Sequence, residues 1–184
     1  MNMAGRIESL QLIEAACWQE LAEATSGPGH DWHHLVLATV AGRHAEARVV
    51  VLREVDIGAR ELIFFTDSRS PKVEQMRAHP EATLVAWSAS RMWQLRLVVR
   101  CTVLTDGLEV SSRWARLKLS PSARDYLSPL PPGTPVDRYL PDRSSREHFA
   151  VVNAQVDSID WLELHADGHR RARFDPQGAR WLQP

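Results

Sequence analysis

The stretch that most constrains the fold runs from Arg48 to Lys72. Two apolar, β-branched runs, residues 49–52 and 62–65, flank a short glycine-bearing turn, and this pattern predicts an antiparallel hairpin. The hairpin begins with a cation and ends in a hydroxyl-rich turn, residues 66–72, that opens a helix. Because hydroxyls, a helix N-terminus and a lysine together can hold a phosphate, this stretch is a candidate anion site.

The rest of the chain predicts a mainly β (α+β) protein with short helices. We expect strands over residues 34–40, 49–52, 62–65, 82–87, 93–104, 149–156, 158–165 and 169–174, and helices over 6–25, 71–79 and 108–119. The first helix dominates the N-terminal segment, 1–25, and residues 120–147, rich in Pro, Ser, Asp and Arg, are expected to form a long loop. Short strands with tight turns favour a closed antiparallel barrel, formed by one domain over residues 1–184.

Charge and cysteine content limit the function classes. The chain has 184 residues and a formal net charge of −1, so no bulk electrostatic attraction to nucleic acid or membrane is expected. Cys17 and Cys101 show neither metal-ligand spacing nor a disulfide framework, which favours a reduced, cytoplasmic setting. No apolar run suggests a signal core or a membrane span.

The run His30-Asp31-Trp32-His33-His34 is the candidate metal-ligand group of the sequence. On a strand, His33 and His34 would point to opposite faces, and no second ligand group has matching spacing. We therefore expect no metal site. The sequence contains neither a Gly-x-Ser-x-Gly nor a Walker-type motif, so it gives no support to hydrolase or P-loop functions.

Four motifs in series resemble the flavin-binding motifs of the pyridoxamine 5′-phosphate oxidase family, which has the FMN-binding split-barrel fold. They are RVVVLR at 48–53, FT at 65–66, SPK at 70–72 and WQLR at 93–96. The resemblance covers residues 30–105 well and 148–175 loosely. It implies an FMN cofactor, a homodimer with the flavin at its interface, and a six-to-eight-stranded split β-barrel flanked by short helices.

The resemblance also implies which residues contact the flavin. These are Arg48, Val49, Val50, Val51, Leu52, Phe65, Thr66, Ser70, Pro71, Lys72, Gln94 and Arg173. Arg48 would pair with the phosphate through its planar fork, Lys72 would add a second cation, and the Gln94 amide suits the N–C=O edge of the ring. The structural alternatives are solvent-facing strand positions for Arg48 and Gln94, and a plain helix N-cap for Ser70.

One position of the phosphate motif departs from the family, which has a basic residue where this chain has Pro71. Proline supplies no donor, so the resemblance implies one phosphate contact fewer. Arg69, two residues earlier, is the candidate to replace it.

The substrate half departs further from the family. The substrate-binding candidates are Arg53, Lys118, Ser122 and Arg171. Arg53 replaces a family lysine, and Trp114, Lys118 and Ser122 stand where the family has Tyr, Arg and Ser. Residues 169–173 resemble an Arg-x-His-x-Arg run, for which a solvated edge strand is the alternative. Trp161 or Leu162 falls near a flavin-packing tryptophan, and Arg143-Ser144-Ser145 is the candidate for a later Gln-Ser pair.

The resulting hypothesis is an FMN-dependent oxidoreductase, similar to pyridoxamine/pyridoxine 5′-phosphate oxidase, that oxidises a C–N bond of a small anionic substrate by hydride transfer to the flavin. The flavin carries the redox step, so no side chain is expected to be an obligate acid or base. The alternatives are a flavin reductase or oxidase of the same fold with another substrate, and a flavin- or haem-binding protein without turnover.

Overall fold

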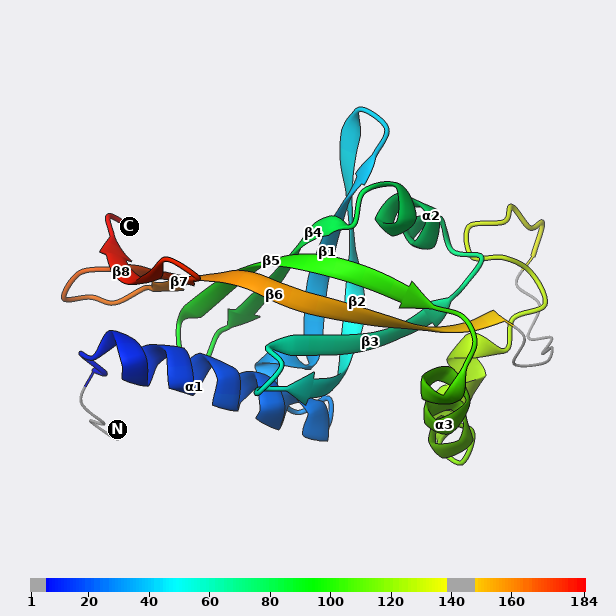
Figure 1. The fold of residues 1–184 in the computed structure, drawn as a ribbon, viewed down its shortest axis with the longest axis horizontal. Helices are drawn as coiled ribbons and strands as arrows, with labels where there is room; N and C mark the ends of the chain where they lie inside the picture. The colour runs from blue at the N-terminus through cyan, green and yellow to red at the C-terminus, as the bar shows by residue number, and fades with distance from the viewer. Residues whose placement is uncertain (1–5, 139–147) are drawn as a thin grey trace.

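The computed structural model describes residues 6–138 and 148–184 of the chain (Figure 1). Its α-helices are α1 (Leu10–Glu23), α2 (Pro71–Ala78) and α3 (Leu108–Leu117), and its 3-10 helices are η1 (Ala24–Ser26), η2 (Asp31–His33) and η3 (Pro121–Tyr126). The strands are β1 (His34–Ala41), β2 (His44–Asp56), β3 (Glu61–Asp67), β4 (Glu81–Ser88), β5 (Trp93–Leu104), β6 (Phe149–Glu163), β7 (Arg170–Asp175) and β8 (Gly178–Leu182). No helix among these residues is long and apolar enough to cross a membrane.

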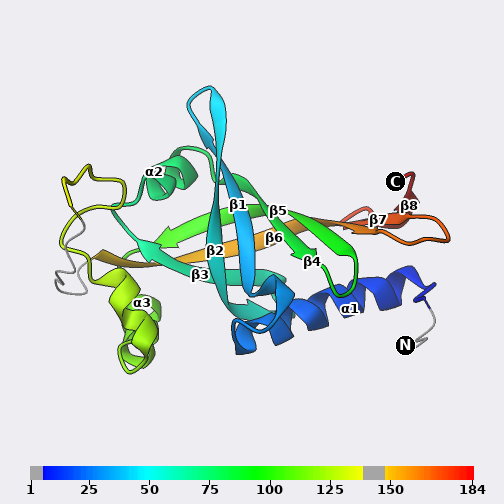
Figure 2. The same cartoon turned by 180° about the vertical axis from the view of Figure 1, so that it is seen from behind.

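The described strands form one antiparallel sheet in the order β3-β2-β1-β4-β5-β6-β7-β8, and β3 also pairs with β6. This second pairing closes the first six strands into a barrel, while β7 and β8 continue the sheet beyond it (Figure 2). The predicted split β-barrel with short flanking helices is therefore confirmed.

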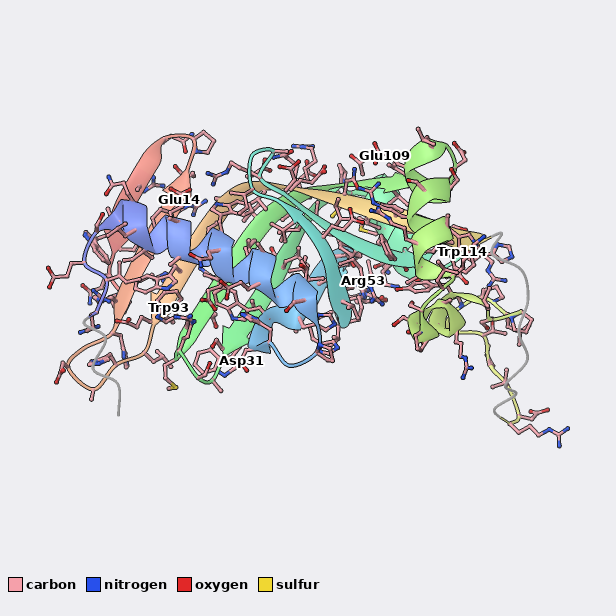
Figure 3. All side chains as sticks on the ribbon, turned by 90° about the horizontal axis from the view of Figure 1, so that it is seen from below. Glu14, Asp31, Arg53, Trp93, Glu109 and Trp114 are labelled. Atoms are coloured by element: carbon pink, nitrogen blue, oxygen red, sulfur yellow. The ribbon has the colours of Figure 1, made fainter. Side chains whose placement is uncertain are left out.

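The main core fills the barrel. Alternate residues of β5, among them Trp93, Leu95 and Leu97, are buried, as strict alternation requires when one face of a strand lines the interior. Helix α1 adds Ile13, Cys17, Trp18 and Leu21 to the same core and runs along one side of the barrel (Figure 3). Both cysteines are buried free thiols, and burial raises the pKa of Cys101 to about 12.

A second, smaller core lies outside the barrel, between β3, β6 and helix α3. It contains Ile63, Trp114, Tyr126 and Phe149, with the Trp114 and Phe149 ring centroids 5.2 Å apart. The expectation of a plain loop from residue 120 was wrong at its start, because η3 buries Ala123 and Tyr126 in this core. Residues 139–147 of the expected loop lie outside the described residues.

Two predictions about the C-terminal strands were wrong. The expected strands 149–156 and 158–165 are one strand, β6. Val98 pairs with Ser158 and Val99 with Val156, so Asp157 is an unpaired bulge residue rather than a turn. Strand β8 was not expected, because its residues are mostly exposed and show no apolar alternation.

The β1–β2 hairpin is longer than expected, because β2 begins at His44 rather than near residue 49. It projects beyond the body of the barrel, next to α2 (Figures 1 and 2). Helix α1 begins at Leu10, where Ser9 caps it by accepting a hydrogen bond from the Leu12 amide.

Candidate functional site

Four predicted phosphate-binding residues meet at one end of the barrel, and we call Arg48, Thr66, Ser70 and Lys72 the anion cluster. Lys72 Nζ donates to Thr66 Oγ1 at 3.0 Å and to Ser70 Oγ at 2.7 Å. Both hydroxyls are buried. Ser70 makes no side-chain capping bond to α2, so the plain N-cap alternative fails for its hydroxyl.

Lys72 has no carboxylate within ion-pair distance among the described residues. Burial lowers the pKa of its ammonium, and the nearby charge of Arg48 lowers it further. Two cations thus share a partly buried place, while Asp67 opposes the shift only weakly. Such a place is electrostatically suited to an anion with several acceptor oxygens, such as a phosphate.

Arg48 shares the core-facing side of β2 with Val50 and Leu52. Its guanidinium donates to Glu46 Oε2 at 2.9 Å, to Gln75 Oε1 at 3.1 Å and to Thr39 Oγ1. The solvent-facing alternative is therefore wrong for Arg48. Glu46 already occupies part of the fork that a phosphate would use.

The neighbouring predictions have mixed outcomes. Pro71 stands at the first positions of α2, where its missing N–H costs no helical bond. Arg69 does not supply the missing phosphate contact, because its guanidinium is engaged by Asp67 and by the carbonyls of Ser128, Pro129 and Leu130. That expectation was wrong.

Arg53 sits at a β-bulge, since the register between β2 and β3 shifts between Leu52 and Glu54. Bulges re-aim side chains, and here Arg53 Nη2 donates to the Tyr126 hydroxyl at 3.3 Å. The guanidinium also lies 5.9 Å from the centroid of the Phe65 ring. Its Nε is buried without a partner among the described residues. Figure 3 labels Arg53 between α1 and α3.

Gln94 points outward from β5, because its neighbours Trp93 and Leu95 are buried. Its side chain makes no hydrogen bond to any described residue, so both ends of the amide are available. In the β4–β5 register Gln94 lies opposite Trp87, which is 43% exposed.

Trp87 belongs to an apolar area on the outward side of β1, β2, β4 and β5, which we call the outer sheet face. Its large members are Val36, Val40, Val49, Trp87 and Val98, with exposed fractions between 38% and 62%. Neighbouring strands bring them together, since Val36 pairs with Val49 across β1 and β2. Gln94 thus stands at the margin of an exposed apolar surface.

The basic strand β7 carries ion pairs. Arg171 donates to both oxygens of Asp160 at 3.0 and 2.8 Å, and Arg96 donates to the same carboxylate at 2.7 Å. Burial acts to raise the pKa of Asp160, but hydrogen bonds from the two arginines outweigh it and hold the pKa below the ordinary value. Arg173 pairs with Asp175 at 3.1 Å.

Several candidates for substrate or ring contacts do not join these groups. Trp161 is fully buried in the core, with its ring centroid 5.4 Å from that of Trp93, so it does not present its face to a ligand from the surface. Trp114, a residue of α3, is buried in the second core. Lys118 is exposed at the end of α3 without a described partner, and Ser122 lies in η3. Arg143-Ser144-Ser145 lies outside the described residues.

One residue of the histidine run, His30, lies close to two carboxylates, those of Glu20 and Glu23. However, His30 Nδ1 accepts a hydrogen bond from the Trp32 amide at 3.1 Å, which leaves Nε2 as the protonated nitrogen that faces Glu20 at 3.2 Å. Glu20 is also paired with Arg91. In this structure the three side chains are thus engaged in hydrogen bonds and ion pairs with protein groups.

Sequence reasoning missed three residues that shape the site. Gln75 links Arg48, Glu46 and Thr39, and helical position alone gave no sign of it. Tyr126, four residues after Ser122, was inside the expected loop. Asp160 alternates with core residues on β6, so a charged residue inside an apolar strand was the available signal.

Residues 15–105 match the family model described as pyridoxamine 5′-phosphate oxidase, FMN-binding domain. A pyridoxine/pyridoxamine 5′-phosphate oxidase of Thermosynechococcus vestitus is 40% identical over 79 residues, which are 42% of this chain. The match spans only 36% of that relative's length.

Solved structures share the fold across the whole chain. A pyridoxamine 5′-phosphate oxidase-related, FMN-binding protein of Nostoc punctiforme is 21% identical, with a TM-score of 0.70 and 100% of both chains covered. PhzG of Burkholderia lata is 18% identical, with a TM-score of 0.72, covering 100% of this chain and 97% of that one. The fold is that of the FMN-binding split-barrel class. The sequence match places residues 15–105 of the chain in the pyridoxamine 5′-phosphate oxidase family.

Proposed function

We propose that this protein binds FMN and acts as an FMN-dependent oxidoreductase on a small anionic substrate. The observation that carries the proposal is the anion cluster, where Lys72 is partly buried beside Arg48 and, among residues 6–138 and 148–184, hydrogen-bonds to hydroxyls rather than to a carboxylate. The FMN phosphate would accept hydrogen bonds from Lys72, Ser70 and Thr66, and from Arg48 once Glu46 turns away. Val49 to Leu52, Phe65 and Pro71 would line the cofactor near this end.

The ring end of the flavin would lie against Gln94 and Arg173. Arg48 faces the core side of β2, whereas Gln94 faces outward from β5, so one protomer does not offer both to one flavin. We infer a homodimer in which one protomer binds the phosphate and its partner supplies the ring contacts. The exposed outer sheet face, with Val49 at 62% exposure and Trp87 at 43%, is the surface that such a partner would cover.

The substrate would be held by cations at the other side of β2 and β3. Arg53 and Tyr126 present a guanidinium and a hydroxyl 3.3 Å apart, and Arg171 of β7 is a further cation; Lys118 and Ser122 complete the candidate set. Bound FMN would supply the redox chemistry, by taking a hydride from the substrate and passing electrons to dioxygen or another acceptor. The protein's own part is to anchor, orient and exclude water, with no obligate acid or base.

A second candidate substrate class is an aromatic carboxylate rather than a phosphorylated B6 vitamer. A planar guanidinium beside a phenol suits a planar carboxylate, and Arg53 replaces the family lysine. PhzG, which shares the fold, was crystallised with tetrahydrophenazine-1-carboxylic acid. We further propose one FMN-binding domain and a cytoplasmic location, in keeping with two free, buried thiols.

The proposal is tested with purified protein. We expect a yellow protein with a flavin absorption band that is lost in Arg48→Ala and weakened in Gln94→Ala, with Thr102→Ala, on the outward face of the same strand, as control. Loss of the band on adding pyridoxine 5′-phosphate without oxygen would indicate a B6 phosphate oxidase. A flavin band that does not respond would favour another substrate, and a Soret band would favour haem. Colourless protein that does not take up added FMN would refute the proposal.

A further inference from the structure

Arg69, which follows β3, has a mostly buried side chain that bonds to two separate parts of the chain. Its Nε and Nη2 donate to the two carboxylate oxygens of Asp67 at 3.0 and 2.6 Å. The same guanidinium donates to the carbonyls of Ser128 at 2.8 Å, Pro129 at 3.1 Å and Leu130 at 3.3 Å. One side chain thus joins the end of a barrel strand to three successive residues of the segment after η3.

The chemistry of this contact requires arginine. Asp67 is buried, with an exposed side-chain fraction of 7%, and a planar fork satisfies both of its oxygens while N–H groups remain for the carbonyls. A lysine ammonium has three donors at one point and does not span the same set of acceptors. The Asp67 hydrogen bonds also raise the pKa of the Arg69 guanidinium.

The fastened segment directly follows a residue of the substrate end. Tyr126 precedes residues 128–130 by two positions, accepts a hydrogen bond from Arg53 Nη2 at 3.3 Å, and packs against Phe65 and Phe149. The chain just before β6 is also attached to this turn, because the Ser68 amide donates to the His148 carbonyl at 2.7 Å. The turn that contains Ser70 therefore holds the anion cluster on one side and this segment on the other.

We propose that Arg69 is a positioning residue: it fastens residues 128–130 to the end of β3 and thereby holds Tyr126 against Arg53 at the substrate end of the site. The fastening stands on the contacts alone, whereas its role toward substrate rests on the proposed function. Arg69 touches neither Lys72 nor the hydroxyls of the anion cluster, so it acts on the substrate end and not on cofactor affinity.

The fastening is tested first without any ligand, in a Tyr139→Phe background that leaves Tyr126 as the sole tyrosine of the chain. In Arg69→Ala we expect chymotrypsin to cut after Tyr126 and Leu127 at least about tenfold faster, because local opening governs cleavage. In the same variant, the pKa of the Tyr126 hydroxyl, measured by spectrophotometric titration, should shift toward that of a free tyrosine. Arg124→Ala, an exposed arginine of η3, is the matched control and should behave like the parent. Unchanged cleavage and titration in Arg69→Ala would overturn the proposal.

The positioning role is tested on FMN-loaded protein, with pyridoxine 5′-phosphate as probe in calorimetric titrations. Arg69→Ala should bind FMN like the parent but bind the probe at least about tenfold more weakly, and Arg69→Lys should restore only part of that loss. Equal probe affinity in parent and Arg69→Ala, despite faster cleavage, would overturn the positioning role. A parent that binds no FMN would refute the proposed function and the positioning role with it, and the cleavage and titration results would still decide the fastening.

Discussion

Lys72 donates from Nζ to Ser70 Oγ at 2.7 Å, although Ser70 holds the N-cap position of α2. The hydroxyl that usually caps a helix is therefore turned toward a cation, and both groups belong to the anion cluster. Replacing Lys72 should therefore weaken FMN binding without destabilising the fold.

Lys72→Met should weaken FMN binding about 10- to 100-fold, since a hydrogen bond from a charged donor contributes about 1.5–3 kcal/mol. Methionine keeps the length and packing of the side chain. Binding is measured by the quenching of FMN fluorescence on titration. Arg77→Met, an exposed cation of the same helix, is the control, and equal losses in both variants would contradict a specific role for Lys72.

Without FMN the same variant should show the opposite effect on stability. The pKa of Lys72 is lowered from 10.5 by burial and by Arg48, so between the lowered pKa and 10.5 the folded state binds fewer protons than the unfolded state. The free energy of unfolding of the parent should therefore rise with pH in that window. Lys72→Met removes this dependence and should be the more stable protein at neutral pH. Urea unfolding between neutral pH and about pH 10 measures both effects, and parallel pH curves would count against the buried-cation account.

Glu46→Gln should tighten FMN binding by up to about fivefold, because it removes a partly exposed carboxylate that pairs with Arg48. The Glu46 carboxylate lies 2.9 Å from Arg48 Nη2 and competes for the fork that would hold phosphate. FMN affinity is measured by fluorescence titration at low salt, and Glu74→Gln on α2 is the control. Weaker binding after Glu46→Gln would show that the carboxylate positions Arg48 rather than competing with the ligand.

Val49→Glu should convert the proposed dimer into monomers, because it places a charge on the outer sheet face, next to Val36 of the neighbouring strand. Val49 is 62% exposed in the single chain, so the substitution leaves the barrel core intact and the circular dichroism spectrum unchanged. Sedimentation equilibrium measures the mass, and FMN affinity should fall in parallel. Leu108→Glu, at a residue of α3 that is 83% exposed, is the matched control. A parent that is monomeric with FMN bound would exclude this interface.

Asp160→Asn should lower the free energy of unfolding at neutral pH by about 1–3 kcal/mol, as expected when charge-assisted hydrogen bonds are lost. The bonds from Arg171 and Arg96 outweigh burial and lower the pKa of Asp160 below 3.8. The contribution is therefore complete above 3.8 and disappears as the pH falls through the lowered pKa. Thermal unfolding at several acidic pH values should show that the stability of this variant falls less steeply with decreasing pH than that of the control, Asp106→Asn. An identical fall in both variants would contradict the pairing.

The barrel could be predicted because its signals are local. The alternation over 93–104 gave both ends of β5, and the hairpin of β2 and β3 followed from its apolar runs. β6 was divided at Asp157 because a bulged charged residue resembles a turn when its partner strand is unknown. β8 escaped notice because its residues are mostly exposed, so no apolar pattern marks it.

The site residues also divide into those that could be predicted from the sequence and those that could not. The residues of the anion cluster were recognisable because the motifs that carry them flank one hairpin. Arg53 was recognised as a cation, but its contact with Tyr126 depends on a bulge and on the path of the chain after α3. Arg69 was assigned to phosphate, whereas its carbonyl partners lie about 60 residues away in sequence, a distance at which no local pattern carries information.

Both native thiols, Cys17 and Cys101, lie in the main core, out of reach of water-soluble reagents. Any cysteine introduced on the surface is consequently the single reactive one in the native protein. A spin label or cross-linker attached at an outward position of β4 or β1 therefore reports on that position alone, in the otherwise unaltered chain.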